Sequence, residues 1–540
     1  MKKIVECVPN FSEGRNKETI EAIADAIQQI KGCRLLDVDP GKSTNRTVYT
    51  FVGFPEAVIE GALNCARVAR QKIDMKTHKG EHHRMGAMDV CPFIPVANVT
   101  MEECVEISKE FGRRAADDLG IPIYLYEESS TREYRKKLPQ IREGQYEGIK
   151  DRIITKEWKP DFGPAEFIPE WGATVTGARF FLIAYNVNLL STSNQAHRIA
   201  LNLREAGRSP DEPGRLAEVK GMGWYVEDYN LAQVTVNLNN YQVTPPHLLF
   251  EEVQKEAKKL NVAVTGSEIV GVIPLEAILM AAEYYIEKEN LFVLDEDQKV
   301  RLAVERLGLN SVAPFNPKEK IIEYIIAEEK IEPLAGLTLR QFIEEVTSRS
   351  SAPGGGSASA AIAAMGVGLG AMVAKLTLGV RKFEDLDAKM RKIVPPLHHA
   401  ANALIPMIDA DTDAFNDYVA ALRLPSDTRE EKELKLEKLQ QGLQKAIEIP
   451  LTTMKLADAA WDAMVETAKY GNIASKSDVE VGAKAMETGI WGAYKNVMIN
   501  MVDITDDIFK NMTMKLAEEI KTRAENQCKR VLEILENREK

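Results

Sequence analysis

The sequence predicts a multidomain protein in which two α/β subdomains precede an all-α helical bundle. Up to about residue 330, short β-type runs alternate with amphipathic helical patterns, and beyond that point the patterns are almost all helical. The 540 residues leave room for three or four folding units of about 100–200 residues each. We expect one subdomain at 1–178, a second at 179–326, a linker at 327–337 and the bundle at 338–540.

The first subdomain combines strand-like and helical segments. Runs of β character occur at 3–9, 34–38, 47–53, 90–96 and 121–126. Helical spacing occurs at 17–30, 56–73 and 101–119. Strands mixed with helices of this length predict a sheet with helices on its face.

A second unit of the same kind begins near Gly177. The strand-like runs are 179–188 and 233–238, and the helical patterns are 193–205 and 246–260. The intervening stretch 158–171 is rich in Pro, Gly and aromatic residues. We expect this stretch to be a hinge that lines a cleft.

Prolines 314, 317 and 333 mark the passage to the bundle, with a linking helix expected at 318–330. Thr338 and Gln341 have the spacing of a capping box, which opens a helix. The remaining expected helices are 391–422, 429–447, 450–469, 478–501 and 504–537.

Composition excludes several classes of protein. With 45% hydrophobic and 28% charged residues, the chain is neither mostly disordered, nor a collagen, nor a coiled-coil rod. Its net charge of -12 argues against a nucleic-acid partner. The start of the chain lacks a long apolar signal core, and six cysteines without CxxC spacing are typical of reduced thiols, so we expect a cytoplasmic protein. The uncharged stretch 352–374 is dominated by Ala, Gly and Ser, which favours a packed helix over membrane insertion.

A histidine-rich loop precedes the strand expected at 90–96. It holds His78, His82 and His83, three of the seven histidines in the chain. Histidine is the natural proton carrier near neutral pH, so catalysis is one interpretation and a purely structural loop is another. A metal bound by His78 and His82 is a third, but Gly80 argues against a helix that would align them, and we expect no metal site.

Two further loops, 8–15 and 37–46, follow short strands. They offer Asn10, Asp39 and Arg46, which could bind an α-amino acid, Arg to a carboxylate and Asp to an ammonium group. Ordinary turn chemistry explains either loop equally well. The Gly41-Lys42-Ser43 sequence is not a P-loop, because the upstream glycine is missing.

Two features of the bundle could carry chemistry. The glycine-rich stretch 351–359 could form a ligand platform at the start of a helix, or merely a flexible entry to it. Asp411 falls on an apolar helical face, whereas Asp409, Asp413, Asn416 and Asp417 form a polar stripe. A carboxyl on an apolar face should have a raised pKa, suited to proton transfer, unless it simply caps a neighbouring helix.

These motifs together resemble the formimidoyltransferase-cyclodeaminase family, bifunctional folate enzymes of histidine degradation. The resemblance covers essentially the whole chain and rests on these segments in order: 8–16, 78–92, 161–164 with 171–174 and 177–179, 351–359, 411–415, and 471–478. It implies that the first domain transfers a formimino group from N-formimino-L-glutamate to N5 of tetrahydrofolate. His82 would be the general acid and base. The implied folate-binding residues are Gly163, Pro164, Phe167, Trp171 and Gly172, of which the two aromatic residues could stack on the pterin.

The resemblance also implies that the second domain closes the ring to 5,10-methenyltetrahydrofolate and releases ammonia, with Asp411 as catalytic acid. Gly354, Gly355, Gly356 and Ser357 would bind folate, and Asn472, Ser475 and Asp478 would bind substrate. Further implications are a ring-shaped homo-octamer and polyglutamylated tetrahydrofolate as co-substrate, without a metal. Three alternatives stay open: a single active half, a second domain that acts as a methenyltetrahydrofolate cyclohydrolase, and a non-catalytic folate-binding protein.

Overall fold

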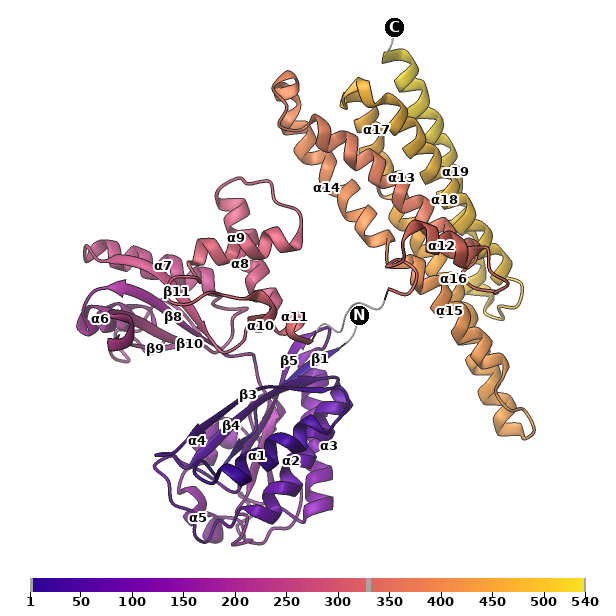
Figure 1. Cartoon of the computed structure of the whole chain (residues 1–540). Helices are drawn as coiled ribbons and strands as arrows, with labels where there is room; N and C mark the ends of the chain where they lie inside the picture. The colour runs from indigo at the N-terminus through magenta and orange to yellow at the C-terminus, as the bar shows by residue number, and fades with distance from the viewer. Residues whose placement is uncertain (1–2, 327–331, 539–540) are drawn as a thin grey trace. The chain divides into compact units, whose positions relative to one another are not determined.

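The computed structural model describes residues 3–326 and 332–538, which form two compact units, one on each side of this gap (Figure 1). The first unit contains two sheets with helices, and the described part of the second is helical. This confirms the predicted fold class. The predicted linker and the predicted helix 318–330 lie partly outside the described residues. The described part of that helix forms two short ones, α10 (Pro317–Lys320) and α11 (Ile322–Ile326).

The first subdomain is built on a seven-stranded mixed sheet. Strand β4 pairs with β1, β2 and β3, while β5 pairs with β1, β2 and β7, and β6 pairs with β7. Pairings among β5, β6 and β7 are parallel and the others are antiparallel. The strands are β1 (Ile4–Cys7), β2 (Asn10–Phe11), β3 (Cys33–Gly41), β4 (Arg46–Gly53), β5 (Met88–Ala97), β6 (Ile123–Leu125) and β7 (Thr174–Ala178).

Helices cover both faces of this sheet. One face packs against α1 (Lys17–Gln28), α2 (Pro55–Lys72) and α3 (Met101–Leu119). The other face carries Val90, Tyr124 and Val175, which pack against α4 (Leu138–Ile141) and α5 (Gln145–Arg152). Residues 158–171 pack into this subdomain, because Asp161 accepts a hydrogen bond from Leu125 N and pairs with buried Arg135. The expectation of a hinge there is therefore wrong.

The second subdomain has a four-stranded antiparallel sheet in the order β11-β8-β10-β9, with helices on one face. Its strands are β8 (Ile183–Leu190), β9 (Val219–Val226), β10 (Leu231–Leu238) and β11 (Ala263–Val270), and its helices are α6 (Ser193–Leu203), α7 (Pro246–Lys259), α8 (Leu275–Lys288) and α9 (Glu296–Leu307). Sequence patterns gave no indication of β9, β11, α8 or α9.

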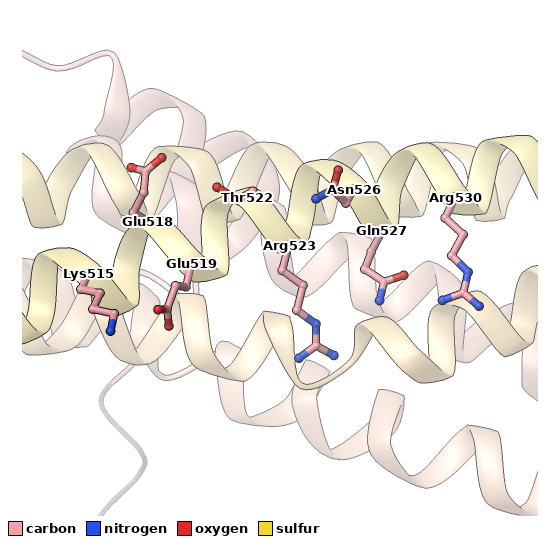
Figure 2. A pocket seen from close by; sticks show the side chains of 8 residues that line it. All are labelled: Lys515, Glu518, Glu519, Thr522, Arg523, Asn526, Gln527 and Arg530. Atoms are coloured by element: carbon pink, nitrogen blue, oxygen red, sulfur yellow. The ribbon is translucent and has the colours of Figure 1, made fainter.

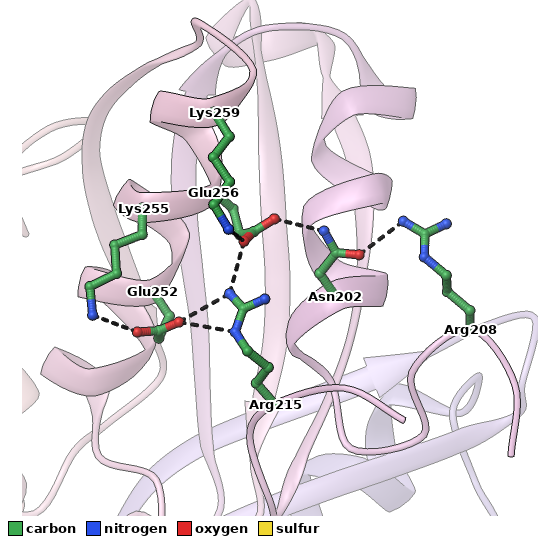
Figure 3. A network of polar contacts seen from close by, with 7 residues as sticks. All are labelled: Asn202, Arg208, Arg215, Glu252, Lys255, Glu256 and Lys259. Atoms are coloured by element: carbon green, nitrogen blue, oxygen red, sulfur yellow. Dashed lines mark hydrogen bonds and ion pairs between the residues drawn. The ribbon is translucent and has the colours of Figure 1, made fainter. Parts of the chain in front are cut away.

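A polar network ties α6 to α7 (Figure 3). Arg215 donates to both Glu252 and Glu256, and Asn202 donates to Glu256 over 2.6 Å. Burial alone would raise the pKa of Glu256, but hydrogen bonds and charges from Lys259, Asn202 and Arg215 lower it to about 2. Glu256 therefore stays ionised and holds the two helices together at neutral pH.

The second unit is a bundle dominated by long helices. Two prolines act differently from expectation. The predicted helix 391–422 is broken at Pro406. Pro450, which is buried, lies inside one continuous helix that joins the predicted helix 429–447 to the first part of the predicted helix 450–469, and the rest of the latter forms a separate helix. The helices are α12 (Leu339–Val346), α13 (Gly355–Thr377), α14 (Asp387–Leu404), α15 (Met407–Leu422), α16 (Arg429–Asp458), α17 (Trp461–Tyr470), α18 (Lys476–Asn500) and α19 (Asp507–Arg538).

Helix α13 packs along α18 through small residues. A side chain at Gly366 would collide with the α18 backbone at Gly482 and Met486, and one at Gly489 would collide with Ala363. Among the helices of the described ranges, α13 alone is long and apolar enough to cross a membrane by length and composition. A core helix of a soluble protein passes the same test, and about half of the tested window, 56%, is buried inside the protein.

Candidate active sites

The first candidate site forms where three loops of the N-terminal subdomain meet. Gly14 packs against the backbone of Gly41 and Arg46, and Gly80 packs against the backbone of Thr44. A side chain at either glycine would overlap these backbone atoms, so the contacts depend on its absence. The two strand-end loops and the histidine loop, which are separate in the sequence, are thereby brought together.

At this junction Arg46 links two other predicted site residues. Its guanidinium donates to Asn10 Oδ1, and its Nη1 lies 3.1 Å from His82 Nε2. Asn10 is itself fixed by a 2.8 Å bond from its Nδ2 to Val8 O. Asp39 is exposed on β3, and its charge acts on Arg46. The buried Nε of Arg46 has no hydrogen-bond partner in the described structure.

His82 is held as a neutral base. Its Nδ1 lies 2.6 Å from His83 O, and because a carbonyl can only accept, Nδ1 carries the proton. Nε2 is then the acceptor that faces Arg46. Burial lowers the pKa of His82 below 6.5, and the positive charges of Arg46 and Arg142 lower it further. A neutral imidazole suits proton abstraction near neutral pH, and the nitrogen that would accept the proton, Nε2, is the one that Arg46 contacts.

His82 lines an open pocket of about 780 Å³. Arg142 contributes to its wall and makes an ion pair with Asp89, a carboxylate that is completely buried and also accepts from Met85 N at 2.7 Å. Arg142 Nε, like Arg46 Nε, is a buried donor without a partner among the described residues. The pocket therefore offers a base beside the Arg142 guanidinium, and Arg46 contacts the same imidazole from outside the lining. The full lining is Glu81, His82, His83, Pro139, Gln140, Arg142, Glu143, Gly144 and Gln145.

His78, by contrast, has a structural role. Its Nε2 bonds to Asn45 O at 2.8 Å, and its Nδ1 accepts from Arg84 Nε at 3.3 Å. Arg84 also binds Glu147 on α5, which fixes the loop against that helix. Both ring nitrogens of His78 are thus engaged. The described residues contain no group of three His, Cys, Asp or Glu side chains arranged to hold a metal ion.

The predicted folate-binding stretch contains mainly structural residues. Trp171 is completely buried and donates from Nε1 to Thr174, so it cannot stack on a ligand as expected. Gly163 and Gly172 have positive φ values of 80° and 81°, and side chains there would overlap Ile121 O and Met85 O. Phe167 is half-buried against Tyr146, with ring centroids 5.4 Å apart, and Pro164 is half-buried. None of the five lines the pocket at His82.

The second candidate site lies at the start of α13. Asp411, on α15, accepts a hydrogen bond from Ser357 Oγ at 3.3 Å, and Ser357 Oγ also lies 3.1 Å from Thr412 Oγ1. The Asp411 carboxylate sits directly over Gly356, where a β-carbon would overlap it. Asp411 therefore caps α13, which is the alternative that the sequence left open. The glycine-rich stretch serves this contact because it admits the carboxylate to the helix backbone.

Capping does not leave Asp411 an ordinary acid. Burial raises its pKa above 3.8, and the hydrogen bonds from the Ser357 side chain and backbone oppose that shift only in part. The group is thus easier to protonate than a solvated aspartate. Gly354 is the N-cap residue of α13, and Gly355 lies next to Asn496.

The rest of the α15 prediction is partly wrong. Asp413, Asn416 and Asp417 are exposed, as the polar stripe requires. Asp409 is not part of a solvated stripe, because its carboxylate accepts hydrogen bonds from Leu334 N and Ala335 N at 2.8 and 3.1 Å. It anchors the chain that enters the bundle.

Asn472, Ser475 and Asp478 lie at the other end of α13 from Asp411. Asn472 N donates to Thr377 Oγ1 at the last residue of that helix, and its side chain caps the turn η5 (Ile473–Ser475). Because α13 has 23 residues, its ends are about 33 Å apart. Within one chain, the two predicted parts of the deaminase site are therefore separate.

A third hollow, of about 720 Å³, runs along α19 (Figure 2). Its lining is Lys515, Glu518, Glu519, Thr522, Arg523, Asn526, Gln527 and Arg530, and it includes neither Asp411 nor the glycine-rich stretch. All eight lining residues belong to α19, and they carry charges of both signs. Sequence analysis did not identify this hollow, nor did it identify Arg142 or Asp89 at the His82 pocket.

Comparison with known proteins finds matches along almost the whole chain. The chain matches "Formiminotransferase domain, N-terminal subdomain" over residues 4–179, "Formiminotransferase domain" over 184–327 and "Formiminotransferase-cyclodeaminase" over 338–519. It is 59% identical to the formimidoyltransferase-cyclodeaminase of Dictyostelium discoideum, across 100% of both chains.

Single-function relatives match the two halves separately. The glutamate formimidoyltransferase of Streptococcus pyogenes serotype M1 is 42% identical and covers 54% of this chain and 95% of its own. The methenyltetrahydrofolate cyclohydrolase of Methylorubrum extorquens is 29% identical and covers 37% of this chain and 97% of its own. With both halves joined in one sequence, and a bifunctional relative matched from end to end, the chain belongs to the formimidoyltransferase-cyclodeaminase family.

Proposed function

We propose that the chain is a bifunctional folate enzyme. Its α/β unit transfers the formimino group of N-formimino-L-glutamate to N5 of tetrahydrofolate, and its helical bundle converts the product to 5,10-methenyltetrahydrofolate and ammonia. The observation that carries the proposal is a pair of proton carriers whose pKa values are shifted in opposite directions. The pKa of His82 is lowered, which leaves a base, and the pKa of Asp411 is raised, which favours an acid.

In the transfer step, N5 of tetrahydrofolate attacks the formimino carbon and loses a proton. His82 Nε2 accepts that proton, since its Nδ1–H is already committed to His83 O. The same imidazolium then protonates the glutamate nitrogen, which departs as an amine. Arg46, which contacts His82, and Arg142, which lines the pocket, carry the positive charges that bind the carboxylates of formiminoglutamate beside the base.

In the second reaction, N10 attacks the formimino carbon and the formimino nitrogen leaves as ammonia. That nitrogen departs only after it gains a proton, which protonated Asp411 supplies. Burial of Asp411 favours the protonated form, and Ser357 orients the carboxyl group. The cyclohydrolase-like alternative would instead add water to the methenyl group.

The decisive experiment mixes the protein with tetrahydrofolate and formiminoglutamate. We expect the ultraviolet absorbance of methenyltetrahydrofolate to rise together with released ammonia. Tight folate binding without turnover would favour a non-catalytic protein, and accumulation of 5-formiminotetrahydrofolate without ammonia would indicate that only the transferase is active. Hydrolysis of supplied methenyltetrahydrofolate, without deamination, would favour the cyclohydrolase alternative.

Our proposal extends to the setting of the enzyme: a cytoplasmic homo-oligomer, in the form of a ring of eight chains, that acts on polyglutamylated tetrahydrofolate without a metal. Six free cysteines support a reducing compartment. Exposed apolar side chains on the bundle, including Met365, Leu376 and Trp491, support contacts between chains. Light scattering after size-exclusion chromatography tests the oligomer, and activity after chelation tests the metal.

A further inference from the structure

The second subdomain has an open sheet face that its helices do not cover. Alternate side chains of the strands, such as Tyr185, Val187 and Val234, point into the core under the helices. The side chains between them point to the opposite face and include Trp224, Met222 and Val270, which are exposed by 46%, 51% and 50%. The strand register therefore places exposed apolar residues on the face opposite the helices.

The centre of this face is polar and largely buried, because Gln233, Asn188 and Asn186 are exposed by only 1%, 0% and 5%. Trp224 Nε1 donates to Gln233 Oε1 at 3.1 Å, which directs the Gln233 amide nitrogen towards Asn188 Oδ1 at 2.8 Å and Glu268 Oε2 at 3.3 Å. Asn186 Nδ2 also approaches Glu268 Oε2, at 3.4 Å. The network crosses all four strands. Small-molecule sites are usually lined by apolar and aromatic side chains with a few fixed polar groups. In this network Trp224 and Glu268 are the members that are not buried, and the buried amides hold them in place.

Glu268 is the group in this network with unused capacity. An ionised carboxylate can accept about four hydrogen bonds, yet both bonds to Glu268 reach Oε2 and both are long. Among the described residues, Oε1 of Glu268 accepts no hydrogen bond, and the carboxylate makes no ion pair with Lys, Arg or His. A half-buried carboxylate without a neighbouring cation is incompletely solvated, so a ligand with N–H donors would be bound favourably there.

We propose that this face binds the pterin ring of tetrahydrofolate, with Glu268 accepting from ring N3–H and the 2-amino group. This inference rests on the proposed function and extends it to the second subdomain. The pterin edge presents two adjacent N–H donors, which match the two oxygens of one carboxylate. Formiminoglutamate carries a similar pair of donors in its formamidine group, but it has no aromatic ring. The exposed indole of Trp224 is linked to Glu268 by two hydrogen bonds through Gln233, and an aromatic side chain there favours the flat pterin ring over formiminoglutamate.

The test is the transferase kinetics of Glu268→Gln in the full chain. Gln keeps the size of the side chain but loses the charge and one acceptor. We expect KM for tetrahydrofolate to rise about 10- to 100-fold and KM for formiminoglutamate to stay within about twofold. Trp224→Leu should raise the same KM more than Trp224→Phe does, because Phe retains an aromatic face. Glu287→Gln, which makes the same charge change on the exposed surface of α8, is the matched control.

Two results would overturn the assignment of this face to the pterin ring. A rise in KM for formiminoglutamate alone would mean that Glu268 recognises the formamidine group. Unchanged constants in an active enzyme would mean that the face is not a substrate site. Circular dichroism and deamination of supplied 5-formiminotetrahydrofolate show whether Glu268→Gln remains folded. If the wild-type chain shows no transfer, the proposed function fails instead. Quenching of Trp224 fluorescence by 5-formyltetrahydrofolate, with Trp224→Phe as the blank, then decides whether the face binds a pterin.

Discussion

His82 depends on three neighbours for its state: the His83 carbonyl fixes its tautomer, and Arg46 and Arg142 disfavour its charged form. Replacing it with alanine should slow formimino transfer by about 10²- to 10⁴-fold, the usual contribution of a general acid and base. Deamination of supplied 5-formiminotetrahydrofolate should continue at the wild-type rate. Initial rates of the two half-reactions, measured separately, check this.

The matched control is His83→Ala, which removes an exposed imidazole but keeps the backbone carbonyl that orients His82. It should transfer almost normally. Loss of transfer in His83→Ala together with an active His82→Ala would identify the neighbour as the proton carrier.

The pH profile of the transferase follows from the shift of the His82 pKa. Because that pKa is lowered below 6.5, the free base persists into mildly acidic solution. The acidic limb of kcat/KM should therefore fall below pH 6.5, as protonation removes the base. A limb centred above pH 6.5 would contradict the environment described for His82.

Asp411→Asn should have the opposite effect on the two half-reactions. Asparagine keeps the size and can still cap α13, but it cannot deliver a proton to the departing nitrogen. Ammonia release should fall by about 10²- to 10⁴-fold, while transfer at His82 is unaffected. Asp413→Asn, on the exposed side of α15, is the control and should be nearly silent. If the control variant abolishes deamination and Asp411→Asn does not, the proton donor has been misassigned.

At the scale of the element, the start of α13 positions the acid. Gly356→Ala would place a methyl group where the Asp411 carboxylate lies, so the carboxylate must move. A displacement of about 1 Å can cost about 10²-fold in rate, and we expect a loss of that order in ammonia release. Gly368→Ala, in the same helix with nothing within 4 Å of its new β-carbon, should keep full activity and stabilise the protein by about 0.4–1 kcal/mol in chemical denaturation. Equal losses in the two variants would point to helix damage and not to displacement of Asp411.

Elements with strong periodicity were predictable, and those that depend on tertiary packing were not. Helix α3 shows a capping box at Thr100 and Glu103 and ends at Gly120 in the left-handed conformation, signals that are all local. Strand β9 contains Gly221 and Gly223, which weaken a strand pattern, and α6 packs so closely there that a side chain at Gly223 would overlap His197. Pro450 breaks a helical pattern in sequence, but burial in the bundle holds α16 together through it.

At the scale of the whole molecule, each unit has its own hydrophobic core. Residues 1–330 alone should therefore fold, transfer the formimino group and accumulate 5-formiminotetrahydrofolate. Ammonia assayed on that fragment should stay at background. Ammonia release by the folded fragment would place deamination in the wrong half of the chain.

The candidate sites were predictable where a motif and its geometry coincide. His82, Arg46 and Asn10 come from three loops, and the structure brings them into contact. Trp171 belongs to the predicted folate-binding stretch, yet it is a core side chain, because sequence does not reveal which way an indole points. Arg142 and Glu268 follow no motif, since their importance depends on pairing across strands and loops that only the fold defines.

Asp411, the proposed proton donor of the deaminase, is also the cap of a helix whose N-cap and first two residues are glycines. Glycine-rich first turns carry a high entropic cost of ordering, so this turn should fray before the bundle melts. Heating would then release Asp411 from its position while the α/β unit still transfers. An enzyme warmed towards its melting temperature should release 5-formiminotetrahydrofolate into solution. The rate of deamination should fall below the rate of formimino transfer well before the protein unfolds.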